Sequence, residues 1–152
     1  MKPTKVFLDS SVIIAGLAIP LPWRGGAKRR GGHCHKILAL AELNLVTPFI
    51  SEDVVSEVLR NIRKKLPESL DHFYMLFKTL PFKMADAAEQ DLKYARTLIN
   101  EKDAAILAAA MAGQVDWLLS LNKHFLTSDL QGRINFSIGS PKDFLDRYVI
   151  EK

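Results

Sequence analysis

Three polar residues in this sequence follow short apolar runs within three positions. Asp9 comes after Val6–Leu8, and Ser120 and Asn122 come after Trp117–Leu119. Runs of this length and composition are typical of buried strands. If both strands belong to one open parallel sheet, their carboxyl ends share an edge, which is where ligands gather in such sheets. We therefore expect Asp9, Ser120 and Asn122 to lie together at a functional edge.

Two further carboxylates are expected at the same edge. Asp103 begins an apolar helix predicted over 104–112, and Glu57 lies early in the helix that follows the second predicted strand. Each residue also has an ordinary explanation. Asp103 can serve only to cap its helix, and a helical wheel places Glu57 outside the apolar arc, as for a solvated side chain. Asp116 precedes its strand, so we expect it at the opposite edge of the sheet.

The residue types at this edge favour a divalent cation. Carboxylates that converge on one place repel one another unless a cation joins them. A set made of oxygen ligands alone suits Mg²⁺ or Mn²⁺ better than zinc. Such an ion can lower the pKa of a bound water and can stabilise the charge of a phosphoryl transition state. The pattern thus predicts a metal site suited to phosphoryl chemistry.

The elements that must position these side chains alternate between strand and helix. Strands are predicted at 6–8, 45–47, 117–119 and 134–138, with a weaker candidate at 82–84. Helices are predicted at 10–17, 33–43, 52–66, 69–80, 86–98, 104–112 and 141–148, with Ser51, Asp86 and Asn100 as candidate N-caps. Strands separated by helices predict an α/β fold, in which helices cover both faces of a parallel sheet.

Size and composition are those of an ordinary globular protein. With 152 residues, 48% of them hydrophobic and 25% charged, we expect one domain over 1–152. The single cysteine, Cys34, can form no intramolecular disulfide. The longest apolar stretch, 104–113, reaches about half of the ~20 residues that a membrane helix needs. Asp9 interrupts the apolar N-terminus, which argues against a signal peptide. These features predict a cytoplasmic protein with no membrane association.

The positive charge is concentrated in one segment. Between residues 10 and 41 there is no Asp or Glu but there are five basic residues, so the other 120 residues together carry −1 of the net +4. Within this segment, a loop rich in Pro and Gly at about 20–32 contains Arg24, Lys28, Arg29 and Arg30. Such a footprint suits a nucleic acid, although a solvated loop would carry the same charge. These four residues are the candidates for contacts to RNA phosphates.

Four segments, taken in order, resemble PIN-domain nucleases. They are VFLDSSV at 6–12, ISEDVVSEV at 50–58, KDAAILAAA at 102–110 and DWLLSLN at 116–122. Their order and gaps are similar to those of the family over about residues 4–140. The basic loop 24–32 resembles the VapC-like subgroup, whose members are described as toxin components of toxin–antitoxin systems.

The resemblance implies a three-layer α/β/α fold and an acidic cluster that binds one or two divalent ions, Mg²⁺ or Mn²⁺. It also implies hydrolysis of RNA phosphodiester bonds by a metal-activated water. Carried over by position, the ligands are Asp9, Glu57, Asp103 and Asn122, with Ser120 as the hydroxyl that assists them. RNA is the implied substrate, and an antitoxin protein and a second copy of this chain are the candidate partners.

One position departs from the family pattern. Asn122 stands where an Asp is more usual, so the fourth ligand offers a neutral carbonyl oxygen and the binding of a second ion is the property most affected. A PIN fold that binds RNA or a partner protein but cuts poorly is therefore the alternative function.

Other kinds of site are less favoured. A phosphatase with Asp9 as nucleophile lacks the second Asp that haloacid-dehalogenase-type enzymes need, because that position is Ser11. The run 33–35, His-Cys-His, has no second ligand pair at zinc-site spacing. The glycine-rich loop lacks the Gly-Lys-Ser/Thr ending of a nucleotide phosphate loop.

Overall fold

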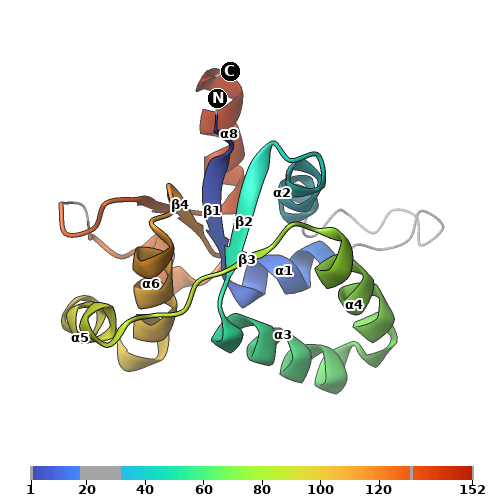
Figure 1. Ribbon diagram of the computed structural model, residues 1–152, viewed down its shortest axis with the longest axis horizontal. Coiled ribbons are helices and arrows are strands. Elements are labelled where there is room, and N and C mark those ends of the chain that lie inside the picture. Colours follow the sequence, from blue (N-terminus) through green and yellow to red (C-terminus); the bar gives the residue numbers. More distant parts are fainter. Residues whose placement is uncertain (1, 18–31, 131, 152) are drawn as a thin grey trace.

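The computed structural model describes residues 2–17, 32–130 and 132–151 (Figure 1). The four basic residues proposed for RNA contacts, Arg24, Lys28, Arg29 and Arg30, lie outside these ranges. In the described ranges, the strands are β1 (Thr4–Leu8), β2 (Val46–Ile50), β3 (Lys83–Met84), β4 (Trp117–Leu119) and β5 (Ser137–Gly139). The helices are α1 (Ser10–Leu17), α2 (Gly32–Glu42), α3 (Glu52–Lys65), α4 (Leu70–Thr79), α5 (Glu89–Leu98), α6 (Glu101–Gly113), α7 (Lys123–Leu126) and α8 (Pro141–Glu151), with a 3₁₀ turn at Pro67–Ser69.

The five strands form one sheet in the order β3-β2-β1-β4-β5, and every pair is parallel. The chain builds the sheet outward from β1 in one direction through β2 and β3, and then returns to add β4 and β5 on the other side. The reversal lies between β1 and β4. In open α/β sheets, the carboxyl ends of the strands at such a reversal border the usual ligand-binding crevice.

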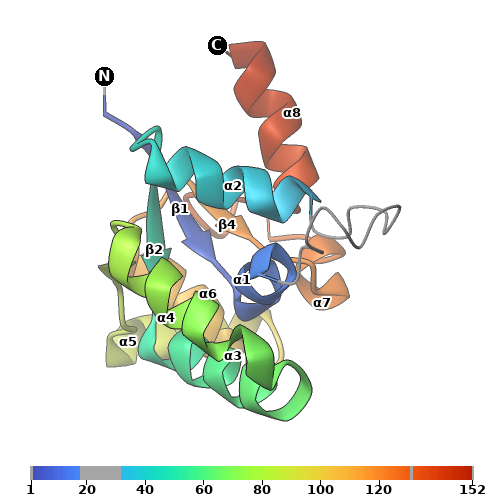
Figure 2. The same cartoon turned by 90° about the vertical axis from the view of Figure 1, so that its right-hand side faces the viewer.

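Helices cover both faces of the sheet, which confirms the predicted three-layer α/β/α architecture. The pair α5 and α6 lies on one side, and α1 and α2 lie on the other (Figure 1). Helix α8 packs beside α2 at the end of the molecule where both chain termini lie (Figure 2). No helix within the described ranges is long and apolar enough to cross a membrane.

The central strands are buried on both faces, as a parallel sheet requires. Phe7, Leu8, Leu118 and Leu119 have no exposed surface, and burial of each such side chain contributes about 1.5–3 kcal/mol. The predicted apolar helix is α6, in which every residue of 106–110 is buried together with Ala104 and Asp103. The carboxylate of Asp103 is therefore carried into the interior by an apolar helix.

Two predicted strands differ in extent from the observed ones. Strand β2 continues through Pro48 to Ile50, and Pro48 pairs with Val6 of β1. The proline is tolerated because β3 pairs only with Phe49 and Ile50, so its missing N–H costs no hydrogen bond to β3. Strand β5 lies at Ser137–Gly139 rather than 134–138, since its register is set by pairing with Trp117–Leu119 of β4.

Two local predictions near the carboxyl edge also need correction. Asp86 does not cap α5, which begins at Glu89 after Ala88; its carboxylate instead accepts from the N–H of Glu52 at 3.0 Å, in the first turn of α3. Helix α7 was not predicted at all, because four residues give no periodic signal. The role of Asp86 depends on a contact with a segment that is distant in sequence, and α7 is too short to show a periodic pattern.

Candidate active site

Asp9 lies at the centre of the carboxyl edge, directly after β1, and is 6% exposed. Its Oδ1 accepts from the N–H of Ser10 at 2.8 Å. Its Oδ2 accepts from the hydroxyl of Ser120 at 2.7 Å and from that of Ser11 at 3.4 Å. The backbone places Asp9 beside β4, because the N–H of Asp9 donates to the carbonyl of Leu119 at 3.1 Å.

The segment after β4 fixes the direction of both hydroxyls. Ser120 Oγ accepts from the N–H of Asn122 at 2.9 Å, and Ser11 Oγ accepts from the N–H of Leu121 at 3.1 Å. Each hydroxyl has a single proton, and with a backbone donor on its oxygen that proton is left for Asp9. The loop after β4 and the start of α1 therefore hold the Asp9 carboxylate between them.

The pKa of Asp9 is raised above its ordinary value of 3.8, and loss of solvation on burial is the main cause. The hydrogen bonds from Ser120 and from the N–H of Ser10 act in the opposite direction. The negative charges of Glu57 and Asp103 raise the pKa of Asp9 further. All three carboxylates therefore share one electrostatic environment in which a cation would be favourable.

Glu57 reaches this edge from α3. It is half-buried, and its Oε1 accepts from the hydroxyl of Ser10. Helix α3 is well anchored, since Ser51 Oγ accepts from the N–H of Val54 as an N-cap and Glu52 and Asp53 lie in the first turn. The side chain of Glu57 is therefore linked through Ser10 to Asp9 and is not a free surface group.

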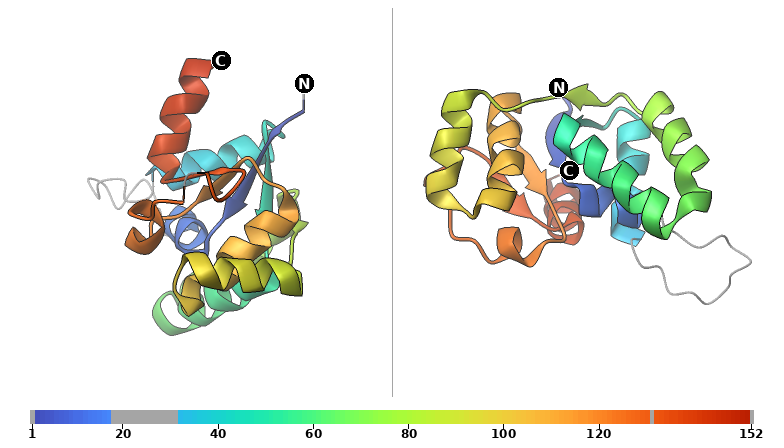
Figure 3. Two further views of the ribbon diagram at one scale, coloured as in Figure 1. Left: turned by 90° about the vertical axis from the view of Figure 1, so that its left-hand side faces the viewer. Right: turned by 90° about the horizontal axis from the view of Figure 1, so that it is seen from below.

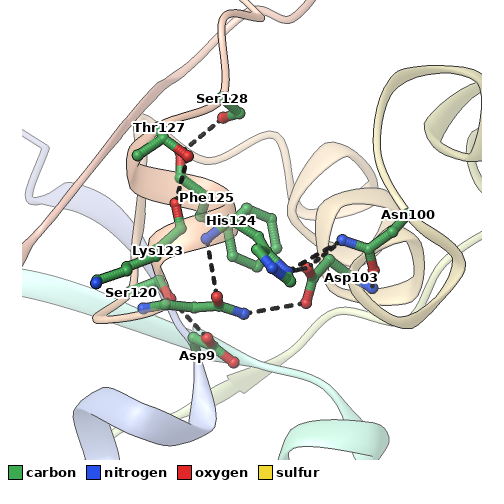
Figure 4. A network of polar contacts seen from close by, with 10 residues as sticks. Asp9, Asn100, Asp103, Ser120, Lys123, His124, Phe125, Thr127 and Ser128 are labelled. Carbon is green, nitrogen blue, oxygen red and sulfur yellow. Dashed lines mark hydrogen bonds and ion pairs between the residues drawn. The ribbon is translucent and has the colours of Figure 1, made fainter.

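Asp103 lies near Asp9 at this edge (Figure 4), and its carboxylate contacts the side chain of Asn122. The Asn122 amide Nδ2 donates to Asp103 Oδ1 at 3.2 Å, and Asn122 Oδ1 accepts from the N–H of His124 at 2.9 Å. The opposite amide orientation would set two acceptors and two donors face to face, so these partners fix it. Asn122 thus caps α7 with its oxygen while its nitrogen supports Asp103.

A continuous path of hydrogen bonds connects all five predicted site residues. From Glu57 it passes through Ser10 to Asp9, then through Ser120 to Asn122 and Asp103. The right-hand view of Figure 3, from below, looks toward this edge, with α3 and α6 to either side of the strand ends. The structure thus brings these residues together, whereas Asp116 accepts from the N–H of Lys5 at 2.8 Å near the amino end of β1, as predicted.

Sequence reasoning missed four participants in this network. Ser10 and Ser11 are not among the predicted site residues, although two hydroxyls directly after a site aspartate are a usable signal. Asn100 was expected to cap α6, and its Oδ1 does accept from the N–H of Asp103 at 3.0 Å. Its amide nitrogen and the ring of His124 both contact the Asp103 carboxylate as well, which no local pattern indicated.

The donor set has the right chemistry for a hard divalent ion. Its ligand atoms are oxygens, as Mg²⁺ and Mn²⁺ prefer. The pKa of Asp9 is raised mainly by burial and further by the negative charges of Glu57 and Asp103, and a cation would offset both effects. In the described part of the chain, however, no three His, Cys, Asp or Glu side chains are gathered closely enough to hold an ion. The residues therefore fit the ion in type and charge, and binding would need side-chain movement.

The His-Cys-His run on α2 does not converge. Cys34 is buried in the core, while His33 and His35 are exposed. Burial raises the pKa of the Cys34 thiol to about 11, which disfavours the thiolate that a metal would need. Cys34 is an apolar core residue in this fold.

We expect Ser120→Ala to lower any activity of this site by about tenfold. The substitution removes the 2.7 Å donor to Asp9 and leaves the N–H of Asn122 without its acceptor, at a cost of about 1–3 kcal/mol. Loss of that donor also raises the pKa of Asp9 further, so the acid limb of a rate–pH profile should move to higher pH. Ser128→Ala is the control, because the Ser128 hydroxyl donates to the Phe125 carbonyl and not to a site residue. An unshifted acid limb in Ser120→Ala would contradict this role.

Comparison with known proteins identifies the family. The sequence matches the PIN domain family over residues 5–124, a span that contains the five site residues. No match was found among curated proteins. Among solved structures, the fold is similar to a chain of VapBC2 from Rickettsia felis bound to a DNA fragment from their promoter. The TM-score is 0.57 at 16% identity, and the alignment covers 89% of this chain and 97% of that chain.

PIN domains are generally nucleases, and PIN-domain nucleases generally use divalent metal ions. The match extends over most of the sequence and includes the whole hydrogen-bonded site, and the observed sheet and layers agree with it. The chain therefore belongs to the PIN domain family.

Proposed function

We propose that this protein is an endoribonuclease that depends on Mg²⁺ or Mn²⁺ and hydrolyses RNA phosphodiester bonds at the carboxyl edge of the sheet. The observation that carries the proposal is the single hydrogen-bonded network that joins Asp9, Glu57, Asp103, Asn122 and Ser120. An apolar fold keeps such a buried acidic network only at a cost, because carboxylates near one another disfavour ionisation. A function that uses their charge explains why the cost is tolerated.

In this proposal Asp9, Glu57 and Asp103 hold the ion. Asn122 can be a further ligand through its carbonyl oxygen, which uses one lone pair for the N–H of His124 and has a second one for the ion. When bound, the ion would lower the pKa of a water and offset the charge that develops on the phosphoryl group. Ser120 and Ser11 keep the Asp9 carboxylate in one orientation through the hydrogen bonds described above. Ser10 does the same for Glu57.

We further propose that the protein is the toxin of a toxin–antitoxin pair and acts in the cytoplasm. The similarity of its fold to a chain of VapBC2 supports an antitoxin partner, and assembly as a homodimer is part of the same proposal. Induced expression of the parent should arrest growth, whereas expression of Asp9→Asn at an equal protein level should not. Equal growth in the two cultures would contradict the toxin assignment.

A catalytically weak binding module remains the second candidate, and two observations favour it. Asn122 brings no negative charge to the site, and the three carboxylates are not gathered tightly enough to hold an ion in the arrangement described. The deciding experiment incubates the purified protein with single-stranded RNA in Mg²⁺, in Mn²⁺ and in EDTA. Cleavage in Mg²⁺ or in Mn²⁺ but not in EDTA supports the nuclease, while RNA binding without cleavage supports the module.

The basic loop gives a separate prediction about RNA binding. If Arg24, Lys28, Arg29 and Arg30 contact phosphates, affinity should fall with salt at a slope of roughly −0.7 per contact on a single strand. The double variant Arg29→Ala, Arg30→Ala should flatten that slope by about one to one and a half units. The rate at saturating RNA should change little, because the loop residues are not part of the acidic cluster. A fluorescence-anisotropy titration at several salt concentrations measures the slope, and an unchanged slope would make the loop a merely solvated segment.

A further inference from the structure

We propose that Asn100 and His124 are positioning residues that occupy one oxygen of Asp103 and so leave the other oxygen as its ligating atom. This inference rests on the proposed metal-dependent function and deepens it. Neither residue belongs to the predicted set of ligands. Both lie beside Asp103 in Figure 4. Asn100 is the N-cap of α6, and His124 belongs to α7.

Asp103 Oδ2 is surrounded by two side-chain donors. The Asn100 amide Nδ2 lies 2.8 Å from Oδ2, and His124 Nδ1 lies 3.3 Å from the same atom. The orientation of the Asn100 amide is fixed, because its Oδ1 accepts from the N–H of Asp103 at 3.0 Å. Because a carboxylate oxygen can only accept, we assign the ring proton of His124 to Nδ1, from which it is donated to Oδ2. In that tautomer the Asn100 amide, at 3.3 Å from Nδ1, makes no hydrogen bond to the ring.

A count of lone pairs shows what these donors leave available. A carboxylate offers about four acceptor positions, two on each oxygen. With the His124 proton on Nδ1, both positions on Asp103 Oδ2 are used, by Asn100 and by His124. On Oδ1 only one is used, by the amide of Asn122. The remaining position is on Oδ1, so Asp103 is prepared to bind a cation through that atom alone, with the plane of its carboxylate held by three donors.

His124 is suited to this role without being needed for the fold. Its side chain is 69% exposed, so little packing is lost when it is truncated. Helix α7 is instead anchored by Phe125, which is 1% exposed, and by Asn122 at its N-cap. The ring of His124 therefore acts on Asp103 from outside the core, as residues that support metal ligands often do.

The test measures Mn²⁺ binding directly, by the electron paramagnetic resonance signal of free Mn²⁺ in a titration of the whole protein. His124→Ala should raise the dissociation constant about tenfold. His124→Asn, which places an amide donor near the position of Nδ1, should stay within threefold of the parent. His72→Ala, at an exposed histidine of α4, is the matched control and should bind as the parent does. The unfolding temperatures of all four proteins in EDTA should agree.

Asn100→Ser provides an independent arm. Serine is as good an N-cap as asparagine, so the variant keeps an acceptor for the N–H of Asp103 while it removes the amide donor to Oδ2. We expect a weakening of Mn²⁺ binding of about tenfold here as well. In RNA cleavage, both variants should shift the half-saturating metal concentration and leave the KM for RNA unchanged.

The outcomes separate this inference from the function on which it rests. If the parent binds Mn²⁺ and cuts RNA but His124→Ala and Asn100→Ser each bind Mn²⁺ within threefold of the parent, the positioning role is wrong and the nuclease stands. A loss in His124→Asn equal to that in His124→Ala would also overturn it, because the donor would then not be what matters. A parent that neither binds Mn²⁺ nor cuts RNA would overturn the proposed function and this inference together.

Discussion

Asp9→Asn is expected to reduce RNA cleavage by at least about 1,000-fold while the fold is retained. Asp9 is the carboxylate at the meeting point of β1 and β4, and it accepts hydrogen bonds from Ser10, Ser11 and Ser120. Removal of its charge weakens the binding of the cation and the stabilisation of the transition state together, and a single such contribution is worth roughly 10²–10³ in rate. Cleavage of a labelled single strand in matched Mn²⁺ measures the loss.

The control for this experiment is Asp116→Asn. Asp116 is exposed and lies at the opposite edge, where its Oδ2 accepts from the N–H of Lys5. An asparagine can still accept that bond, so this variant removes one negative charge without touching the site. It should cut RNA at the parental rate. If Asp9→Asn also cuts as fast as the parent, the assignment of a nuclease site at this edge is wrong.

Asp9→Asn should also change how the stability of the metal-free protein depends on pH. Burial raises the pKa of Asp9 in the folded state above its ordinary value of 3.8. The folded protein therefore binds this proton more readily than the unfolded chain, and stability is lost as pH rises from about 3.8 through the folded-state pKa. Asn at this position cannot ionise. The unfolding free energy of Asp9→Asn in EDTA should accordingly gain on that of the parent between pH 4 and pH 7, as urea titrations at several pH values would show.

Asn122→Asp is expected to lower the metal concentration for half-maximal activity by about tenfold or more. The variant replaces a neutral ligand by a carboxylate, which interacts directly with a divalent charge. Without metal, the same substitution is expected to destabilise the folded protein. The Asn122 amide that now donates to Asp103 Oδ1 at 3.2 Å would be replaced by an oxygen, and two negative groups would face each other. We therefore expect a lower unfolding temperature in EDTA and tighter Mn²⁺ binding in the same protein.

Asn135→Asp is the matched control for this charge change. Asn135 is exposed and precedes β5, at the amino-end edge of the sheet. Asn135→Asp adds the same negative charge to the protein at a distance from the site. Neither the metal concentration for half-maximal activity nor the unfolding temperature in EDTA should therefore move as it does for Asn122→Asp. Equal metal midpoints in Asn122→Asp and the parent would mean that residue 122 does not contribute to ion binding.

Much of this protein could be predicted from the sequence because the signals are local or periodic. Apolar runs such as Val6–Leu8 and Trp117–Leu119 identify strands, and the end of each run locates a residue at the sheet edge. Asn100 and Ser51 were recognisable as N-caps since a cap depends only on the next three residues. Alternation of strands and helices then sufficed for the parallel sheet and its three layers.

What the sequence alone determined is therefore which residues reach the carboxyl edge: Asp9 and Ser120 by strand ends, and Asp103 by a helix start. Only the tertiary structure decided how they act on one another. It showed that Ser10 links Glu57 to Asp9, that Asp86 serves α3 and not α5, and that Asp103 receives donors from Asn100, Asn122 and His124. These partners are separated by up to 47 residues along the chain. Hydrogen bonds of this kind depend on side-chain directions fixed by packing between elements, and no periodicity or local propensity records those directions.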